Sequence, residues 1–317
     1  MVEAAGTVAS RVGPVVDSNV HLWEQRRNPV FWLADRTMVR DMIGNYDVLP
    51  DTYTLADYND ATAPFDVRGV VWSDAGAADP VAAAEQVAEQ NTDGQVVGLV
   101  ALGDPADRGF ERLVTALRGN PLVTSVRVRF VPGLQPGTAA ETADPGGPMI
   151  DGLAVLAEHG LVATVETTGS QLGQVADLAR RLPRLQLVLD HFGWPEDLSA
   201  SGRRAHLAQL HLLAEEPNVA TRIDAIGTIF RDWDTDTVRP WLRDVVAAFG
   251  PERCMLGSDL PIETLRSSFT DLYTAYDAIF DAFSDDDRRA LFADTARRLY
   301  GPGAAGIDDA AGPTRPT

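Results

Sequence analysis

Polar residues that can do chemistry stand at or near the ends of several short apolar runs. Asn19 and His21 close the first run, and Arg127 and Arg129 lie in the fourth. Residues two apart in an extended segment point to the same side, so each pair can serve one site. Imidazole and carboxylate groups act as general acids, general bases or metal ligands, and guanidinium groups bind oxyanions. The ends of other runs supply the remaining candidates, Glu166, Asp190, His191 and Asp259.

The elements that must position these residues are strands that alternate with helices. Eight short runs rich in β-branched residues are each followed by a stretch of helical periodicity. Continuous apolar runs are typical of parallel strands buried on both faces. The pattern predicts an α/β fold, a single (β/α)8 TIM barrel, in preference to an open doubly wound sheet. The predicted strands are residues 14–20, 67–72, 96–102, 125–130, 162–166, 185–190, 219–224 and 253–257.

A barrel places its catalytic side chains at the carboxyl ends of its strands, so the polar residues above should meet at one mouth. A long insertion after the first strand, residues 23–66, leaves from that mouth, and we expect a lid or a substrate wall there. A second loop is expected over residues 132–148. We expect residues 1–13 to form an N-terminal extension, 14–301 the barrel and 302–317 a disordered tail.

Composition excludes several classes of partner and cofactor. The 317 residues carry 27 arginines and no lysine against 46 Asp and Glu, a net charge of −19. So acidic a chain lacks the basic patch of proteins that bind nucleic acid or anionic membranes. Without lysine there is no Schiff base, no P-loop and no carboxylated lysine to bridge two metals. No GxGxxG follows the first strand, so we expect no nucleotide cofactor.

The partner that remains is a small-molecule substrate, and the sequence leaves a homo-oligomer open. A cytoplasmic location is expected. Residues 1–13 lack the apolar core of a signal peptide. No stretch approaches the roughly 18 apolar residues of a membrane span. The one cysteine, Cys254, excludes an internal disulfide.

Five motifs, in order along residues 14–301, resemble the amidohydrolase-2 family. They are VVDSNVHLW, TSVRVRF, LVLDHFGWP, FGPERCMLGSDLPI and LFADTARRLYG. The third is similar to the family's Asp-His-x-Gly-x-Pro segment, and the fourth to its FGxERxxxGSDxP segment. The family comprises TIM-barrel metal-dependent hydrolases, including L-fuconolactonase and 2-pyrone-4,6-dicarboxylate lactonase, and related decarboxylases.

This resemblance implies a lactonase or amidohydrolase-like hydrolase that acts on a lactone or a similar cyclic ester or amide. Asp259 would orient or deprotonate the attacking water. His21 and His191 would bind a metal or polarise the carbonyl, and Arg127 would hold an anion or the developing oxyanion. The substrate contacts that we expect are Asn19, Arg129, Glu166, Trp23 and Trp194.

The first motif departs from the family pattern Asp-x-His-x-His. Asn19 stands where the family has its first histidine, and asparagine is a poor zinc ligand. His21, His191 and Asp259 then remain as candidate metal ligands, with Glu166 as a further one. The resemblance therefore implies one divalent metal, zinc or manganese, or none.

Two other functions fit the same residues. A non-hydrolytic family member, such as a decarboxylase or a tailoring enzyme for a small organic acid, would work without metal and is favoured by Asn19 and Trp194. Trp194 stands where lactonases of the family commonly carry a basic residue, which suggests a flatter or more apolar substrate than a sugar acid. A non-catalytic binding protein is disfavoured, because Asp259, His191 and Arg127 are all present.

Overall fold

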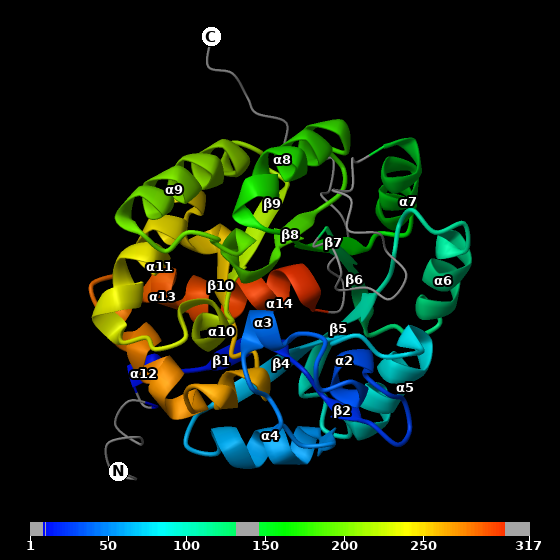
Figure 1. Cartoon of the computed structure of the whole chain (residues 1–317), viewed down its shortest axis with the longest axis horizontal. Coiled ribbons are helices and arrows are strands. Elements are labelled where there is room, and N and C mark those ends of the chain that lie inside the picture. The colour runs from blue at the N-terminus through cyan, green and yellow to red at the C-terminus, as the bar shows by residue number, and fades with distance from the viewer. Residues whose placement is uncertain (1–8, 10, 131–145, 302–317) are drawn as a thin grey trace.

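Eight parallel strands form the centre of the molecule, and helices surround them (Figure 1). The computed structural model describes residue 9, residues 11–130 and residues 146–301. The strands follow one another around the sheet in sequence order. They are β1 Val15–Val20, β4 Val67–Ser73, β5 Val96–Leu102, β6 Val123–Arg129, β7 Val162–Glu166, β8 Leu187–Leu189, β9 Val219–Ile223 and β10 Cys254–Leu256.

The sheet closes on itself between its first and last strands. The backbone of His21 donates to Leu260 at 2.8 Å, and that of Asp259 donates to Asn19 at 2.9 Å. These bonds join the chain just after β1 to the chain just after β10, which is the closure of a barrel. The predicted (β/α)8 TIM barrel is confirmed, and each predicted strand coincides with an observed one.

The helices that follow the strands pack their apolar stripes against the outer face of the sheet. Several begin at residues that cap helices well: Asp79 accepts from the first turn of α5, and Ser268 forms a capping box with Asp271. The α-helices outside the insertion are α5 Pro80–Gln90, α6 Phe110–Leu117, α7 Gly147–Glu158, α8 Leu172–Arg181, α9 Ala200–Ala214, α10 Ile226–Phe230, α11 Thr235–Phe249, α12 Phe269–Ile279, α13 Asp285–Arg289 and α14 Thr295–Tyr300.

The insertion after β1 has its own small elements. Two short strands of the insertion, β2 Trp23–Glu24 and β3 Thr52–Tyr53, pair antiparallel and so bring residues 23 and 53 together. Between them lie two single-turn helices, α2 Phe31–Ala34 and α3 Arg40–Ile43, and α4 Leu55–Thr62 follows. In Figure 1, α3 lies in front of the strands. The expected wall over the barrel is therefore present.

Two expected segments fall wholly or largely outside the described residues. The tail 302–317 lies outside them, and so do residues 132–145 of the second loop. The prediction that this loop extends to residue 148 is wrong, because α7 begins at Gly147. Pro148 suits the first turn of a helix, where a backbone N–H has no partner to lose.

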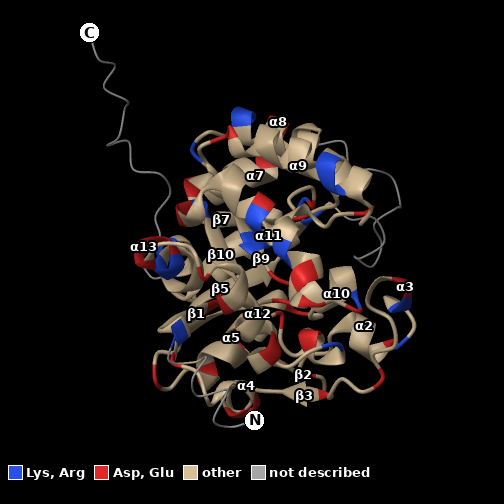
Figure 2. Ribbon diagram, turned by 90° about the vertical axis from the view of Figure 1, so that its left-hand side faces the viewer, with Lys and Arg blue, Asp and Glu red and all other residues tan. Residues whose placement is uncertain are grey.

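Charged segments are interspersed over the helices rather than sorted by sign. Figure 2 shows arginine-bearing and acidic segments side by side, as on α13, where Asp285 to Asp287 precede Arg288 and Arg289. Within the described part of the chain, no helix is both long enough and apolar enough to cross a bilayer.

Candidate active site

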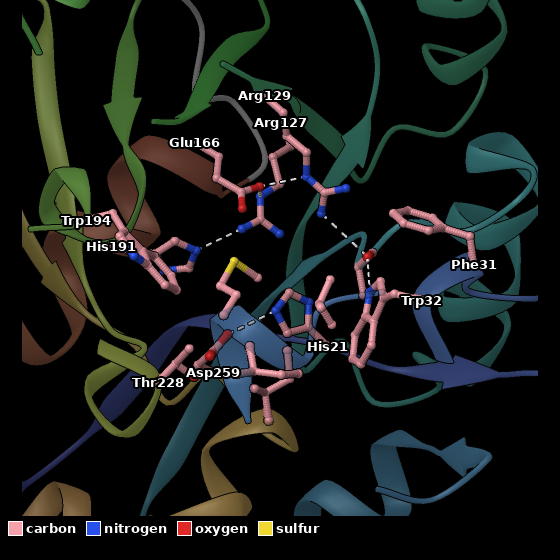
Figure 3. A pocket seen from close by; sticks show the side chains of 15 residues that line it. His21, Phe31, Trp32, Arg127, Arg129, Glu166, His191, Trp194, Thr228 and Asp259 are labelled. Atoms are coloured by element: carbon pink, nitrogen blue, oxygen red, sulfur yellow. Dashed lines mark hydrogen bonds and ion pairs between the residues drawn. The ribbon is translucent and has the colours of Figure 1, made fainter. Parts of the chain in front are cut away.

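A cavity opens at the carboxyl ends of the strands and encloses about 510 Å³, part of it open to solvent. Figure 3 shows side chains from β6, β7 and the turns after β1, β8 and β10 pointing into it. This is the mouth at which a TIM barrel holds its active site. The cavity is lined by His21, Phe31, Trp32, Val39, Met42, Ile43, Ala75, Arg127, Arg129, Glu166, His191, Trp194, Thr228, Asp259 and Ile262.

Asp259 and His21 form a buried pair on one side of the cavity. Nε2 of His21 lies 3.0 Å from Oδ1 of Asp259, and Nδ1 lies 2.7 Å from the backbone oxygen of Ser73. A carbonyl oxygen only accepts, so Nδ1 carries a proton. The other nitrogen faces a carboxylate oxygen, so the bond between the two side chains needs a second proton. The pair therefore holds an exchangeable proton between Nε2 and Oδ1.

Among the described residues, side chains form hydrogen bonds to one oxygen of the Asp259 carboxylate. Oδ1 also accepts from Nδ2 of Asn19 at 3.2 Å. In the part of the chain that the structure describes, the hydrogen bonds to this carboxylate all end on Oδ1, and Asp259 lines the cavity. The residue sits just after β10 with a left-handed φ of 59°. Such backbone is rare for a residue other than glycine and is typical of functional turns.

Arg127, on β6, is fixed opposite this pair by several partners. Its Nε donates to Asp190 at 2.9 Å and lies 3.2 Å from Glu166, and its Nη2 lies 2.9 Å from Nε2 of His191. A third contact, from Nη1 to the backbone oxygen of Asp74, is 3.4 Å long. A guanidinium held in this way presents a fixed positive charge to the cavity.

Arg129 extends the same cluster, because its Nε donates to Glu166 at 2.7 Å. Burial by itself would raise the pKa of Glu166, but the charges of Arg127 and Arg129 outweigh it and hold that pKa well below its usual range. Glu166 is therefore a carboxylate at neutral pH. It pairs with both arginines and has no proton to give there.

His191 is held between a carboxylate and a guanidinium. Its Nδ1 donates to Asp224 at 2.7 Å, and its Nε2 accepts from Arg127. Burial lowers the pKa of His191, but Asp224 outweighs this and raises it to about 8. The bond to Arg127 belongs to the neutral ring, so a proton that arrives at Nε2 must displace Arg127. This imidazole exchanges its proton near neutral pH.

The turn that carries His191 has an unusual backbone. His191, Phe192 and Trp194 all have positive φ angles, 52°, 40° and 42°. The turn brings the rings of His191 and Trp194 into an edge-to-face contact with centroids 5.4 Å apart, and both rings line the cavity. Neither the turn nor this contact can be read from the local sequence.

A buried polar layer lies beneath the site and fixes its strand ends. Asp17 accepts from the backbone of Ser258 at 2.8 Å and from the hydroxyl of Tyr58 at 2.9 Å. Burial raises the pKa of Asp17 to about 6, although these bonds counteract it. Arg222 is fully buried and donates to Asp190 at 2.6 Å. These groups support the site without lining the cavity.

The residues proposed as metal ligands do not fit a divalent ion in this arrangement. A metal needs several lone pairs directed at one point. Instead, the free nitrogen of His191 faces the cationic Arg127, and Glu166 is paired with two guanidiniums. Among the described residues, no group of three or more His, Cys, Asp or Glu side chains could hold a metal.

Seven of the residues singled out from the sequence line the cavity: His21, Arg127, Arg129, Glu166, His191, Trp194 and Asp259. The other three do not line it. Asp190 is fully buried and accepts from Arg127 at 2.9 Å. Asn19 is fully buried behind Asp259, and Trp23 is buried in the insertion, where its indole donates to the backbone of Pro50 at 2.9 Å. The structure thus places Asn19 as a support for Asp259.

Sequence reasoning missed Asp224 and the wall residues of α2 and α3. Asp224 stands at the carboxyl end of a predicted strand, so the rule that found Asp259 could have found it. Met42 and Ile43, in contrast, lie in the insertion that was expected to form a wall, but the sequence does not show which of its residues line the cavity.

Comparisons with known proteins agree with this site and fold. A profile of the amidohydrolase family matches residues 16–301. The chain is 26% identical to the uncharacterised protein y4mH of Sinorhizobium fredii, over 90% of this chain and 98% of that protein. It is 34% identical to an L-fucono-1,5-lactonase of Burkholderia ambifaria, over 50% of this chain and 52% of the lactonase.

Solved structures show the same architecture. An amidohydrolase from Burkholderia multivorans, crystallised with bound zinc, superposes with a TM-score of 0.76 at 22% identity and covers 91% of this chain and 99% of that one. The family profile extends over almost the whole barrel and includes every described residue that lines the cavity. The chain therefore belongs to the amidohydrolase family and is a TIM-barrel hydrolase.

Proposed function

We propose that this hydrolase opens a lactone or a similar cyclic ester, with water activated by Asp259. The observation that carries the proposal is the state of the Asp259 carboxylate. Oδ1 is held by His21 and Asn19, while Oδ2 accepts no hydrogen bond from the described residues and Asp259 lines the cavity. A carboxylate oriented in this way can accept a proton from a water molecule in the cavity. The partial match to a lactonase supports the choice of substrate.

The reaction then follows from the residues opposite Asp259. Oδ2 takes a proton from water as its oxygen attacks the carbonyl carbon, and negative charge develops on the carbonyl oxygen. Arg127 lies across the cavity, fixed and always charged, and stabilises that oxyanion. Collapse of the intermediate breaks the ring carbon–oxygen bond. The alkoxide that leaves takes up a proton, and the product is a hydroxy acid.

Asp259 and His21 together carry the transferred proton in this scheme, and His191 holds Arg127 in place. The proton held between His21 and Asp259 keeps the carboxylate oriented, and the pair can share the proton taken from water. Because Arg127 donates to Nε2 of His191, the leaving oxygen takes its proton from the Asp259–His21 pair, which returns the one taken from water. Glu166 has no proton to give, so its role is to hold Arg127 and Arg129.

Asp259→Asn tests the proposal directly. The amide keeps the shape but cannot accept a proton from water, so we expect kcat to fall by about 1,000-fold or more. Lactone opening would be followed by the acid that it releases, and near-ultraviolet circular dichroism would show whether the fold is kept. Asp236→Asn, at an exposed position on α11, is the matched control. Near-normal turnover by a folded Asp259→Asn would contradict the mechanism.

Chelation tests the fit of the metal ligands. We expect dialysis against a chelator to leave turnover unchanged and the purified enzyme to hold metal well below one ion per chain, because Arg127 is placed where an ion would need the lone pair of His191. Elemental analysis and activity would be measured on the same sample. Activity that is lost on chelation and restored by zinc or manganese would show that the ligands rearrange around an ion.

A further inference from the structure

The cavity has two unlike sides. The catalytic side carries the charged residues at the strand ends. The facing side consists of apolar residues, five from the insertion and one from the chain after β10: Phe31, Trp32, Val39, Met42, Ile43 and Ile262. We call these six residues the apolar wall.

The apolar wall offers almost no hydrogen-bonding group to a ligand. Its one polar atom is Nε1 of Trp32, which already donates to the backbone of Ala75 at 2.7 Å. An indole has a single donor, so nothing remains for a substrate hydroxyl. Among the described residues that line the cavity, Thr228 alone carries a hydroxyl group. A sugar ring, with a hydroxyl on most carbons, would leave several of them unpaired against this wall.

The charged side chains at the cavity and just beneath it are matched before any substrate enters. Three guanidiniums, those of Arg127, Arg129 and Arg222, are paired with three carboxylates, those of Glu166, Asp190 and Asp224. Asp259 is paired with His21. A dicarboxylate substrate would add two negative charges beside Glu166 and Asp259. The balance favours an uncharged ligand, because a buried charge without a partner is strongly unfavourable.

The apolar wall is held in place, so its shape is already formed. Arg231 donates to the backbone oxygens of Asp41 and Met42, at 2.9 and 3.1 Å, and Arg266 donates to that of Ile43 at 3.3 Å. These carbonyls end α3 and have no partner within the helix. The next residue, Gly44, has a φ of 83°, and a Cβ there would lie 2.7 Å from Nη2 of Arg266. The wall therefore presents a fixed apolar surface rather than a loose loop.

We propose that the substrate is an uncharged lactone that carries an alkyl or aryl group, and that this group packs on the apolar wall while the ring carbonyl faces Arg127. The proposal rests on the lactone-opening activity proposed above and adds the chemical class of the substrate. It separates this enzyme from relatives that act on sugar lactones. Pockets that are mainly apolar, with a few placed polar groups, are the usual form of small-molecule sites.

Kinetics on the full chain test the substrate class. The uncharged apolar probes are dihydrocoumarin and δ-decalactone, and the polar probes are D-glucono-1,5-lactone and 2-pyrone-4,6-dicarboxylate. We expect kcat/KM for the apolar pair to exceed that for the polar pair by about 100-fold, the factor by which an apolar pocket rejects one added hydroxyl. Equal or better turnover of a polar probe would overturn the substrate class while leaving lactone opening intact.

Single substitutions test whether the apolar wall determines the preference for apolar lactones. Met42→Gln keeps the length of the side chain but adds an amide, so the preference for δ-decalactone over D-glucono-1,5-lactone should fall about tenfold. Met38→Gln is the matched control, because Met38 is in the same insertion but is 45% exposed and does not line the cavity. A preference that survives Met42→Gln, or that Met38→Gln changes equally, would contradict the role of the wall.

A binding measurement tests apolar recognition separately from lactone opening. The lactam analogue of dihydrocoumarin has the same shape but resists opening, and its affinity would be measured calorimetrically on the wild-type enzyme. We expect binding that Met42→Gln weakens about tenfold and Met38→Gln leaves unchanged. If no lactone is opened but the lactam binds in this way, the reaction is wrong and the apolar recognition stands. If lactones are opened and the lactam does not bind, the recognition is wrong.

Discussion

At the scale of single residues, the most informative one is Arg127. Its guanidinium contacts three side chains from the ends of two other strands, so one residue ties the polar half of the site together. The sequence placed Arg127 at a strand end and suggested an anion binder, but its contact with His191 was not foreseen. That contact explains why the expected metal ligands do not converge.

Arg127→Lys tests whether geometry or charge matters at this position. Lysine keeps the positive charge but has one donor group, so it cannot hold Asp190, Glu166 and His191 together. We expect kcat to fall about 100- to 1,000-fold, the loss typical of an oxyanion donor, with a smaller change in KM. Steady-state kinetics would measure both constants. Arg108→Lys, outside the site, should behave like wild type. A kcat within a few-fold of wild type would show that charge alone suffices.

At the scale of elements, the loops that surround the mouth are held by a buried carboxyl group. Glu263 is fully buried in the short helix η4, Ile262–Leu265, next to the wall residue Ile262. It accepts from the backbone of Gly227 at 2.8 Å and from the hydroxyl of Ser267 at 2.5 Å. One side chain therefore joins α10 to η4. Burial raises the pKa of Glu263 to about 8.

This raised pKa predicts a pH dependence of stability. The folded state keeps a proton that the unfolded chain releases above pH 4.5, the ordinary value for Glu263, so stability is lost as pH rises from 4.5 through 8. Glu263→Gln cannot ionise, so its melting temperature should fall less between pH 5 and pH 8 than that of wild type. Between pH 5 and pH 8, we expect the free energy of unfolding of Glu263→Gln to rise by about 1 kcal/mol or more relative to that of wild type.

The control for this series is Glu111→Gln, at an exposed position in the first turn of α6. Its melting temperature should follow the wild-type curve across the whole pH range. If Glu263→Gln follows the same curve as wild type, Glu263 ionises in the folded protein without penalty, and burial does not control its proton.

At the scale of the whole molecule, the barrel is plugged at the end opposite the active site. A buried cluster joins inner residues of the strands, such as Val71 and Val188, to Leu299 and Tyr300 of α14. Close approach is possible because Gly98 on β5 has no side chain: a Cβ there would lie 2.3 Å from the backbone oxygen of Tyr300. Helix α14, at the end of the described residues, thus closes the barrel at the end opposite the active site.

Gly98→Ala should disturb this seal. The added methyl group meets backbone that cannot move freely, so we expect a loss of about 1–3 kcal/mol in the free energy of unfolding. Urea unfolding would measure it. Gly147→Ala is the matched control, since a Cβ at Gly147 meets nothing within 4 Å. Equal stability of the two variants would mean that α14 shifts away from β5 at little cost.

Much of this protein follows from its sequence alone. The alternation of apolar runs and helical stretches determined the barrel, because buried parallel strands and amphipathic helices have different periods. Strand ends converge in any such barrel, so Asp259, His191, His21, Arg127, Arg129 and Glu166 could be assigned to one mouth before their neighbours were known.

Only the tertiary structure decided how those residues are paired. Arg127 meets His191, 64 positions away, and Asp259 meets His21 at a distance of 238 positions. Side-chain partners at such separations depend on loop paths and on left-handed turns such as those at His191 and Asp259, which local propensity does not favour. The same holds for the apolar wall, because α2 and α3 are too short to be stable alone and take their place by packing over the barrel.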